Sequence, residues 1–449
     1  MQKMLRIACV SALVLAGCST TPEMSVNDAG VDASSIDMGR ADGGSRDSGA
    51  PDAGNDAGPS CTSGCGIAQV EAGFWHTCAR RENGQVLCWG NNLWSELGDN
   101  SGRHMTCPPV HEGIVTDCSV NPVQPVGFTD ATDIAVHRST NSCARHADGS
   151  WQCWGVSFVP ATGMPTQNAS PVSYPSLSGA VQVANTSSFA CMIVASGAVE
   201  CVGYNDGGEL GDGTNVQRTS RVANGVTGAT QLDVGSSHAC ALLSDGHISC
   251  WGSNQSGQLG DGITHGTCGA GARQYDCALT PVQVALIDDA TQVATGASHT
   301  CALRADHTVW CWGGNSYGAL GSGEEADELT PVQVDALSNV SAIAAGDNNT
   351  CALNDSGAIY CWGANQRGTL GDGATTHSVC SVDSNDCSRV PVSVATIDDA
   401  TAITVGGAHA CAIRGDESVW CWGYNVDYQL GVSPNTDINT PTQVTSLNP

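Results

Sequence analysis

The residues of this sequence best suited to metal or redox chemistry are histidine, cysteine and aspartate, and they gather at three points. At each point a histidine stands three residues before a cysteine, and an Asp-Cys dipeptide follows. The three sets are His104 and Cys107 with Asp117-Cys118, His265 and Cys268 with Asp276-Cys277, and His377 and Cys380 with Asp386-Cys387. All three residue types bind zinc, so one hypothesis is a metal site in each set. We favour a second hypothesis, a disulfide-closed loop whose histidine caps the turn, and we expect no metal or other cofactor.

A further group of cysteines forms seven pairs, each with a separation of ten residues. Residues at this spacing can face each other across a β-hairpin with a short turn, where their β-carbons come close enough for a disulfide. Buried, reduced thiols are the alternative, but export to an oxidising compartment would favour the bond. We therefore predict seven disulfides within the repeated units, which join Cys78 with Cys88, Cys143 with Cys153, Cys191 with Cys201, Cys240 with Cys250, Cys301 with Cys311, Cys351 with Cys361 and Cys411 with Cys421. Three more are predicted to close the loops, by joining Cys107 with Cys118, Cys268 with Cys277 and Cys380 with Cys387. The last predicted disulfide joins Cys61 with Cys65.

Repetition argues against catalysis by the other polar side chains. Four histidines stand two positions before the first cysteine of a pair, at His76, His238, His299 and His409. A residue repeated in four units is more economically explained as a hydrogen-bond donor that holds a turn. The Gly-Asp-Gly segments are interpreted as solvated turns, because the ligand spacing of known calcium loops is absent. The sequence has no P-loop, dinucleotide fingerprint, GxSxG elbow or HExxH motif, so we expect no enzymatic activity.

The elements that must position these residues are short strands. The first cysteines of the seven pairs follow one another at steps of 65, 48, 49, 61, 50 and 60 residues, which defines a repeated unit with three insertions. Each unit, as in residues 290–334, contains four apolar pieces, rich in β-branched or aromatic residues and bounded by Gly, Asp or Pro. Seven such units predict an all-β fold, a seven-bladed β-propeller of four-stranded blades with the tryptophans of the Cys-Trp-Gly tripeptides between blades. The insertions carry the three histidine and cysteine sets and leave the same edge of their blades.

Two long segments carry a resemblance to a known family. They are SSHACALLSDGHISCWGSNQSGQLGDG at 236–262 and ASHTCALRADHTVWCWGGNSYGALGSG at 297–323. Both resemble the repeats of the regulator of chromosome condensation family, which implies a seven-bladed propeller over residues 67–447. The loop Asn-x-x-x-x-Leu-Gly recurs in six units but is missing from the second, and the third has Cys201-Val202-Gly203 in place of Cys-Trp-Gly. Kelch-like and other propellers are the alternative, although their double glycine does not recur.

Residues 1–18 are expected to be an export signal, because Lys3 and Arg6 precede an apolar run too short to span a bilayer. The segment Leu15-Ala16-Gly17-Cys18 resembles the lipobox of bacterial lipoproteins, which implies that Cys18 becomes the lipidated N-terminus; an ordinary signal peptide with a chance cysteine is the alternative. Residues 19–60 repeat Asp-Ala-Gly and contain no aromatic residue, so we expect a disordered tether before a propeller at 61–449. The protein is therefore expected to be exported and lipid-anchored at the bacterial outer membrane or cell surface.

Charge narrows the possible partners. The chain has 44 acidic and 16 basic residues, a formal charge of −28, which argues against binding to nucleic acid or to anionic lipid headgroups. We expect a monomeric, non-catalytic interaction module of the cell envelope whose loops on one propeller face bind a protein or a glycan, with Trp94, Tyr275 and Tyr317 as candidate anchors. One alternative is an enzyme inhibitor, because β-lactamase inhibitory protein II has a similar propeller. Guanine-nucleotide exchange, the activity of the family's namesake, is a further alternative.

Overall fold

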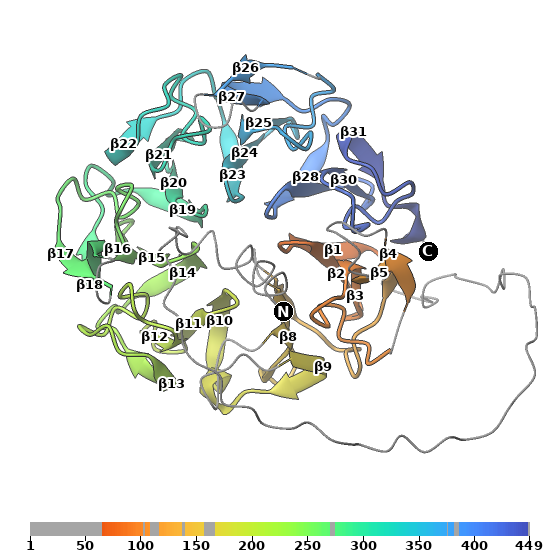
Figure 1. Cartoon of the computed structure of the whole chain (residues 1–449), viewed down its shortest axis with the longest axis horizontal. Coiled ribbons are helices and arrows are strands. Elements are labelled where there is room, and N and C mark those ends of the chain that lie inside the picture. The colour runs from red at the N-terminus through yellow and green to blue at the C-terminus, as the bar shows by residue number, and fades with distance from the viewer. Residues whose placement is uncertain are drawn as a thin grey trace, which may run out of the picture. The chain divides into compact units, whose positions relative to one another are not determined.

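The structure is a computed structural model, and it describes residues 65–101, 104–107, 116–136, 140–156, 167–269, 274–374, 376–380 and 386–447. The predicted signal peptide, the predicted tether and Cys61 lie outside these residues. The described residues belong to one compact unit, Gly58–Pro449, in which seven antiparallel sheets are arranged in a ring (Figure 1). The predicted fold class, an all-β seven-bladed β-propeller, is therefore confirmed. No helix among the described residues is both long and apolar enough to cross a bilayer.

Each sheet is one blade, and its strands are consecutive along the chain. Blade one contains β1 (Ile67–Ala72), β2 (His76–Arg81), β3 (Val86–Asn91), β4 (Met105–Cys107) and β5 (Thr116–Val123). Blade two contains β6 (Asp133–Ala135), β7 (Asn141–Arg145), β8 (Trp151–Val156) and β9 (Gln167–Ser173). Blade three contains β10 (Ala180–Asn185), β11 (Phe189–Val194), β12 (Val199–Gly203) and β13 (Arg218–Ala223), after the short 3-10 helix η1 (Pro175–Leu177).

The other four blades follow the same plan. Blade four contains β14 (Ala229–Val234), β15 (His238–Leu243), β16 (Ile248–Ser253), β17 (Gly266–Cys268) and β18 (Tyr275–Gln283). Blade five contains β19 (Ala290–Thr295), β20 (His299–Arg304), β21 (Val309–Gly313) and β22 (Glu328–Gln333). Blade six contains β23 (Val340–Ala345), β24 (Asn349–Asn354), β25 (Ile359–Ala364), β26 (Ser378–Val379) and β27 (Asp386–Ser393). Blade seven contains β28 (Ala400–Val405), β29 (His409–Arg414), β30 (Val419–Gly423) and β31 (Ile438–Gln443), followed by η2 (Thr445–Leu447).

The prediction of four strands per blade is right for blades two, three, five and seven and needs a correction for the other three. Blades one, four and six have five strands, and the extra strands β4, β17 and β26 lie at the sheet edge, where they pair with the start of β5, β18 and β27. We call the fourth strand of the repeat, which includes β5, β18 and β27, the outermost strand of its blade. These extra strands come from the three insertions and are two or three residues long. Such short segments have no hydrophobic periodicity of their own, so only the pairing with a neighbouring strand defines them.

The ten-residue cysteine spacing sets the register of the central hairpin in every blade. Cys78 lies directly opposite Cys88, and the six other pairs face each other in the same way between the second and third strands. The first of these hairpins turns at Gly84, whose φ of 85° suits glycine. A Cβ at Gly84 would also lie 2.7 Å from the Asp130 backbone, so this turn fixes the contact with blade two as well as the hairpin.

Tryptophans join neighbouring blades, as the sequence predicts. Six of them are fully buried, and each indole N–H donates to a backbone carbonyl in the loop of the preceding blade. The donor and acceptor pairs are Trp154 with Glu96, Trp251 with Glu209, Trp312 with Gln258, Trp362 with Ala319, Trp422 with Thr369, and Trp89 with Gln429. Blade three has Val202 instead of tryptophan, and the sequence of blade two, which precedes it, lacks the Asn-x-x-x-x-Leu-Gly motif. Among the described residues at this contact, Trp151 donates to the Ala180 carbonyl at 3.1 Å.

Among the described strands, those of blade one are the first in the chain and those of blade seven are the last, and the two blades share no strand. Side chains of both blades, including Trp89 and Leu430, share one hydrophobic cluster at this junction. The buried guanidinium of Arg81 donates to the Leu447 carbonyl at 3.0 Å and to the Cys65 carbonyl at 2.8 Å. One side chain therefore binds backbone from both ends of the propeller.

Candidate functional site

The three insertions leave the same end of their blades. In blades one, four and six the chain enters the insertion after the third strand and returns along the outermost strand, so antiparallel order puts every insertion at one end. The turns between first and second strands lie at this end too, since the N–H of Asn91 at the end of β3 donates to the Trp75 carbonyl at 3.0 Å. We name this end, formed by those turns and by the loops between third and outermost strands, the insertion face.

A disulfide closes each insertion at its base. The bonds join Cys107 with Cys118, Cys268 with Cys277 and Cys380 with Cys387, and all six cysteines are buried. The second cysteine of each pair lies in the outermost strand of its blade. The enclosed sequences, PPVHEGIVTD, GAGARQYD and SVDSND, have little in common except the final aspartate. The three insertions therefore share a frame but differ in the residues that the frame holds.

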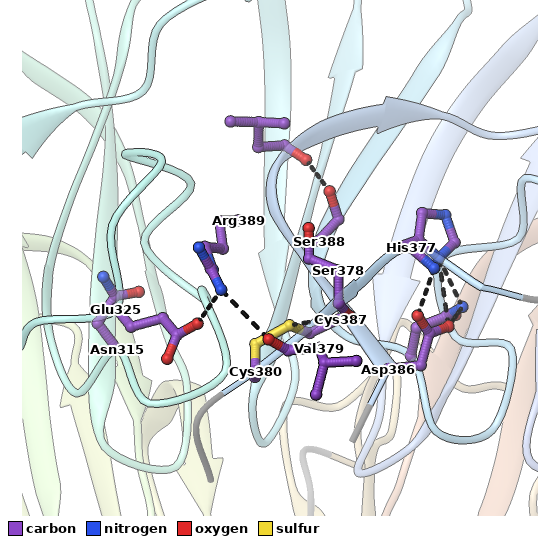
Figure 2. Close-up of a disulfide and its surroundings, with 12 residues drawn as sticks. Asn315, Glu325, His377, Ser378, Val379, Cys380, Asp386, Cys387, Ser388 and Arg389 are labelled. Carbon is purple, nitrogen blue, oxygen red and sulfur yellow. Dashed lines mark hydrogen bonds and ion pairs between the residues drawn. A yellow bond between two sulfur atoms is a disulfide. The ribbon is translucent and has the colours of Figure 1, made fainter. Parts of the chain in front are cut away.

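The histidine of each insertion lies between two aspartates. In blade six, His377 Nε2 is 2.7 Å from Asp372 Oδ2 and Nδ1 is 3.2 Å from Asp386 Oδ2. The His377 backbone N–H also donates to Asp386 Oδ1 at 2.6 Å, and Figure 2 shows this side chain beside Asp386. The other two blades repeat the arrangement, with His104 at 2.8 Å from Asp99 and 3.3 Å from Asp117, and with His265 at 2.9 Å from Asp261 and its N–H at 2.6 Å from Asp276.

In blades one and six this arrangement is a hydrogen-bonded clamp that holds one histidine between two carboxylates. In blades one and six the two carboxylates contact opposite nitrogens of the ring, so an ion on one nitrogen would be out of reach of one of the carboxylates. The neighbouring cysteines, which the zinc hypothesis needed as ligands, are bonded to each other. Within the described ranges of the chain, no group of three or more His, Cys, Asp or Glu side chains is arranged to hold a metal ion.

The aspartates favour the charged form of two clamped histidines, His104 and His377. The hydrogen bond to Asp99 raises the pKa of His104 against the opposing effect of burial, and both Asp99 and Asp117 add to the rise through their charge. Burial disfavours a charge on His377, but the hydrogen bonds to Asp372 and Asp386 outweigh it and raise its pKa as well. The clamp is therefore strongest when the histidine is protonated.

An arginine links the insertion of blade six to blade five. Arg389 pairs with the Glu325 carboxylate and donates to the Val379 carbonyl of β26 at 3.2 Å (Figure 2). Glu325 belongs to the loop between the third and outermost strands of blade five. The insertion is thus held by its disulfide, by its clamp and by a contact to the neighbouring blade.

Two family models match the chain. The model of the RCC1-like domain matches residues 114–448, and the model of the regulator of chromosome condensation (RCC1) repeat matches residues 67–93. The chain belongs to the RCC1-like family. The resemblance seen in the sequence is therefore confirmed, and it covers most of the propeller.

Solved structures with the RCC1-like fold come from yeast and human. In the structure of Kap60 bound to yeast RCC1 (Prp20), the match has 21% identity, 81% coverage of this chain, 84% coverage of that chain and a TM-score of 0.65. Prp20p from Saccharomyces cerevisiae, described together with its binding to Gsp1p and histones, has 21% identity and a TM-score of 0.64, and the match covers 81% of this chain and 86% of that chain. Human WBSCR16 has 20% identity and a TM-score of 0.65, and the match covers 81% of this chain and 94% of that chain. At these identities the likeness concerns the fold.

The four repeated histidines of this RCC1-like propeller join blades, whereas the sequence analysis expected them to hold a turn. Each Nε2 contacts a hydroxyl of the next blade, in the pairs His76 with Ser142, His238 with Thr300, His299 with Thr350 and His409 with Thr77. Because the Thr77 hydroxyl donates to the Gln429 carbonyl at 2.7 Å, it accepts from the histidine, which fixes the Nε2–H tautomer. Burial lowers the pKa of His76 and of His409 to about 3, so both rings are neutral.

Four glutamines in the innermost strands also join neighbouring blades, a role that the sequence did not predict. Each side-chain amide donates to, and accepts from, the backbone of one residue in the next blade, at 2.8 to 3.2 Å. The pairs are Gln69 with Ile134, Gln182 with Leu232, Gln231 with Val293 and Gln292 with Ile343. The signal is a glutamine at the third position of the innermost strand. Alanine occupies this position in blades six and seven, which hides the repetition.

The predicted binding residues lie on three different blades rather than in one cluster. Trp94 and Tyr317 each stand two positions after the loop asparagine, in blades one and five, and Tyr275 begins β18 in blade four. All three are half-buried. They can therefore act as anchors only for a partner that spans several blades.

The seven cysteine pairs with ten-residue spacing are disulfide-bonded, with Cα separations of 4.0 to 4.1 Å and with each pair inside one blade. In chain order the bonds join Cys78 with Cys88, Cys143 with Cys153, Cys191 with Cys201, Cys240 with Cys250, Cys301 with Cys311, Cys351 with Cys361, and Cys411 with Cys421. Cys65 is also disulfide-bonded, while Cys61, its predicted partner, and Cys18 lie outside the described residues.

Proposed function

We propose that this RCC1-like protein is a non-catalytic interaction module of the cell envelope, anchored through a lipid on Cys18, that binds a protein or a glycan with its insertion face. The family supports the role as an interaction module, since the RCC1-like propeller is a binding and exchange-factor fold rather than that of a classical enzyme. The proposed location in the cell envelope and the proposed use of the insertions rest on the residues of this chain.

The observation that carries the proposal is the shared frame of the three insertions. A disulfide, an extra strand and an Asp-His-Asp clamp recur in blades one, four and six, while the sequence between the cysteines changes. A loop with no role would not need three separate restraints. Variable residues held on a rigid frame are typical of recognition loops, because order before binding lowers the entropy lost on binding.

An enzyme inhibitor would be the same kind of module with an enzyme as its partner. It would also use the insertion face, so the same experiment covers it. Guanine-nucleotide exchange is not favoured by any contact described above. The binding of Gsp1p belongs to yeast Prp20p, and the likeness to that protein at 21% identity extends to the fold alone.

The test is a comparison of two full-length proteins recovered from their own cells with a mild crosslinker and detergent. One is the natural sequence. The other has the residues between the cysteines of each insertion replaced by Gly-Ser of equal length, with the cysteines and the aspartates and histidines of the clamps retained. We expect at least one envelope protein to be recovered with the natural sequence and to fall about tenfold or more with the replaced loops. Circular dichroism and melting temperature check that both proteins are folded.

A glycan partner would escape this capture, so both proteins are also applied to a glycan array. A signal seen with the natural loops alone would assign a glycan to the same face. The proposal is wrong if protein recovery and glycan binding are the same for the two proteins. Recovery of a single enzyme whose activity falls on binding would identify the inhibitor alternative.

A further inference from the structure

Two tyrosines stand at the same position of two blades but differ in exposure. Tyr204 in blade three and Tyr424 in blade seven each follow the glycine that ends the third strand. Their N–H groups donate to equivalent backbone carbonyls, those of Ser188 at 3.0 Å and Ala408 at 2.9 Å. Tyr204 is 42% exposed and Tyr424 is 9% exposed. Because the two backbones are held alike, the difference in exposure must come from the side chains that cover each tyrosine ring.

An arginine covers the tyrosine of blade seven. The guanidinium of Arg367 lies 5.0 Å from the centre of the Tyr424 ring, and it donates to Asp437 Oδ2 at 3.3 Å. Arg367 comes from the Asn-x-x-x-x-Leu-Gly loop of blade six, the preceding blade. The propeller thus contains one complete site in which a tyrosine ring and a carboxylate bind a guanidinium.

The tyrosine of blade three has no such arginine among the described residues. The preceding blade is blade two, whose sequence lacks the Asn-x-x-x-x-Leu-Gly motif, and its connection at 157–166 reads SFVPATGMPT, without arginine or lysine. In the part of the chain that the structure describes, the arginines that lie over aromatic rings cover Trp310, Tyr424 and Trp420 but not Tyr204. The Tyr204 hydroxyl donates to Asp206 Oδ2 at 2.5 Å, so a carboxylate stands beside this ring as well.

Further acidic and aromatic groups surround this pair. Glu209 lies in the same loop, and its Oε2 accepts the Gly207 N–H at 2.8 Å. A Cβ at Gly207 would lie 3.0 Å from the Tyr275 hydroxyl of blade four and 2.8 Å from Glu209 Oε1, so the absence of a side chain there lets these groups converge. Burial raises the pKa of Tyr275 to about 12, with help from the charges of Glu209 and Asp206. Burial raises the pKa of Glu209 to about 7, so the carboxylate that accompanies the rings of Tyr204 and Tyr275 is that of Asp206.

We infer that Tyr204, Asp206, Glu209 and Tyr275 form a site for a guanidinium or ammonium group supplied by the partner of the insertion face. The cation lies on the Tyr204 ring and pairs with Asp206, as Arg367 lies on Tyr424 and pairs with Asp437 within the chain. The partner is therefore basic at its point of contact with blades three and four, which agrees with the net charge of −28. This inference rests on the proposed function, because it names the chemistry that the bound partner presents.

The site can be tested without the partner, by nuclear magnetic resonance of the full chain labelled with carbon-13 in its seven tyrosines. The probe is N-acetyl-arginine amide, and N-acetyl-citrulline amide is its neutral match. We expect the Tyr204 and Tyr275 signals to shift saturably with the arginine compound. The citrulline compound should bind about tenfold more weakly, and so should the arginine compound to the variants Asp206→Asn and Tyr204→Leu. Unchanged signals from the other tyrosines show that these variants are folded.

The covered tyrosine of blade seven provides the internal control. Tyr424 should not respond in the natural sequence, and it should respond to the arginine compound in the variant Arg367→Ala. The inference is overturned if citrulline shifts Tyr204 as strongly as arginine does, if Tyr204 does not shift, or if Asp206→Asn binds unchanged. If this titration fails while the loop-dependent capture succeeds, the cation site is refuted and the proposed function stands. If the capture fails while the titration succeeds, the proposed function is refuted and the cation site stands.

Discussion

At the scale of residues, the same side chain carries opposite charge states in two parts of the propeller. In the insertions of blades one and six, the rings of His104 and His377 each contact two carboxylates, which favour the imidazolium. Two histidines between blades, His76 and His409, contact a hydroxyl, and burial lowers the pKa of each to about 3, so they are neutral. Partner chemistry and burial, rather than the local motif, therefore decide the charge. The same principle applies to Glu96 and Glu209 at the contacts between blades, where burial raises the pKa of both carboxyls.

Glu96 provides a residue-scale prediction about pH. Burial raises its pKa to about 8 from an ordinary 4.5, with additions from the charges of Asp427 and Asp117. A carboxyl with a raised pKa in the folded state contributes stability that is complete below pH 4.5 and is lost as pH rises through 8. The variant Glu96→Gln stays neutral, so its free energy of unfolding should exceed that of the natural sequence increasingly from pH 5 to pH 8, by roughly 2–4 kcal/mol at the top. Urea unfolding at several pH values measures the difference.

The repeats supply the matched control for this prediction. Glutamine already occupies the equivalent position in blades four and seven, where Gln258 and Gln429 accept the N–H two residues earlier at 2.9 and 3.0 Å. Trp94 donates its N–H to Glu96 in the same way at 2.8 Å, so the substitution keeps the contact. The reverse change, Gln258→Glu, should introduce a loss of stability with rising pH. A flat pH profile for both differences would show that these positions do not titrate as described.

At the scale of elements, the sequence predicts the strands that repeat and misses those that do not. The cysteine spacing, with Cys78 opposite Cys88 as its first case, yields the hairpin register in all seven blades. The three-residue strand β4 has no pattern of its own and forms because Met105 pairs with Cys118. Of the insertion sites, the sequence predicts the disulfide partners but not the role of Asp99 and Asp372. Each stands five residues before its histidine, but only the three-dimensional contacts show that the two side chains meet.

The glutamines of the innermost strands lead to a prediction at this scale. The Gln292 amide binds the N–H and the carbonyl of Ile343 at 2.9 and 2.8 Å, as a neighbouring strand would. The variant Gln292→Ala should lower the free energy of unfolding by about 1–3 kcal/mol, because both backbone groups lose their partner. It should also speed hydrogen exchange at the Ile343 amide. Chemical denaturation and exchange mass spectrometry measure the two effects.

A matched variant separates the donor from the acceptor. In Gln292→Glu the side chain keeps an oxygen for the Ile343 N–H but loses the N–H that the Ile343 carbonyl accepts. Exchange at Ile343 should then stay slow while part of the stability is lost. If Gln292→Ala leaves both stability and exchange unchanged, the glutamines fill space between blades and do not bind them together.

At the scale of the whole molecule, the blades are similar in frame but not in what they present. Blades one, four and six carry the insertions, and the contact between blades two and three has neither the Asn-x-x-x-x-Leu-Gly motif nor the tryptophan of the other contacts. Because of these departures, the blades of a nearly symmetric ring can be told apart. A partner that binds the insertion face therefore meets different residues at each blade, which a symmetric propeller would not provide.

Lipidation is the prediction for the N-terminal part of the chain. If Cys18 carries a lipid, cells fed with labelled palmitate should label the natural protein and not the variant Cys18→Ser, and the natural protein should enter the detergent phase of Triton X-114. The reason is the large apolar area that acyl chains add to an acidic, water-compatible chain. Equal labelling of both proteins, or natural protein found in the aqueous phase, would assign the first residues to an ordinary signal peptide.

Ring closure is the last prediction, because it tests how the propeller holds together. Since blades one and seven share none of the described strands, the Arg81 hydrogen bonds to the Leu447 and Cys65 carbonyls are among the contacts that join both chain ends to one blade. The variant Arg81→Met keeps the apolar stem and loses these bonds, so we expect a loss of about 2–3 kcal/mol. Hydrogen exchange should quicken in β1, β31 and η2 and stay unchanged in blade five. The control Arg304→Met changes the same position of blade five, where the arginine pairs with Asp289 nearer the surface, and should cost under about 1 kcal/mol. Equal losses in the two variants, or faster exchange spread evenly over all seven blades, would show that Arg81 has no particular role in closing the ring.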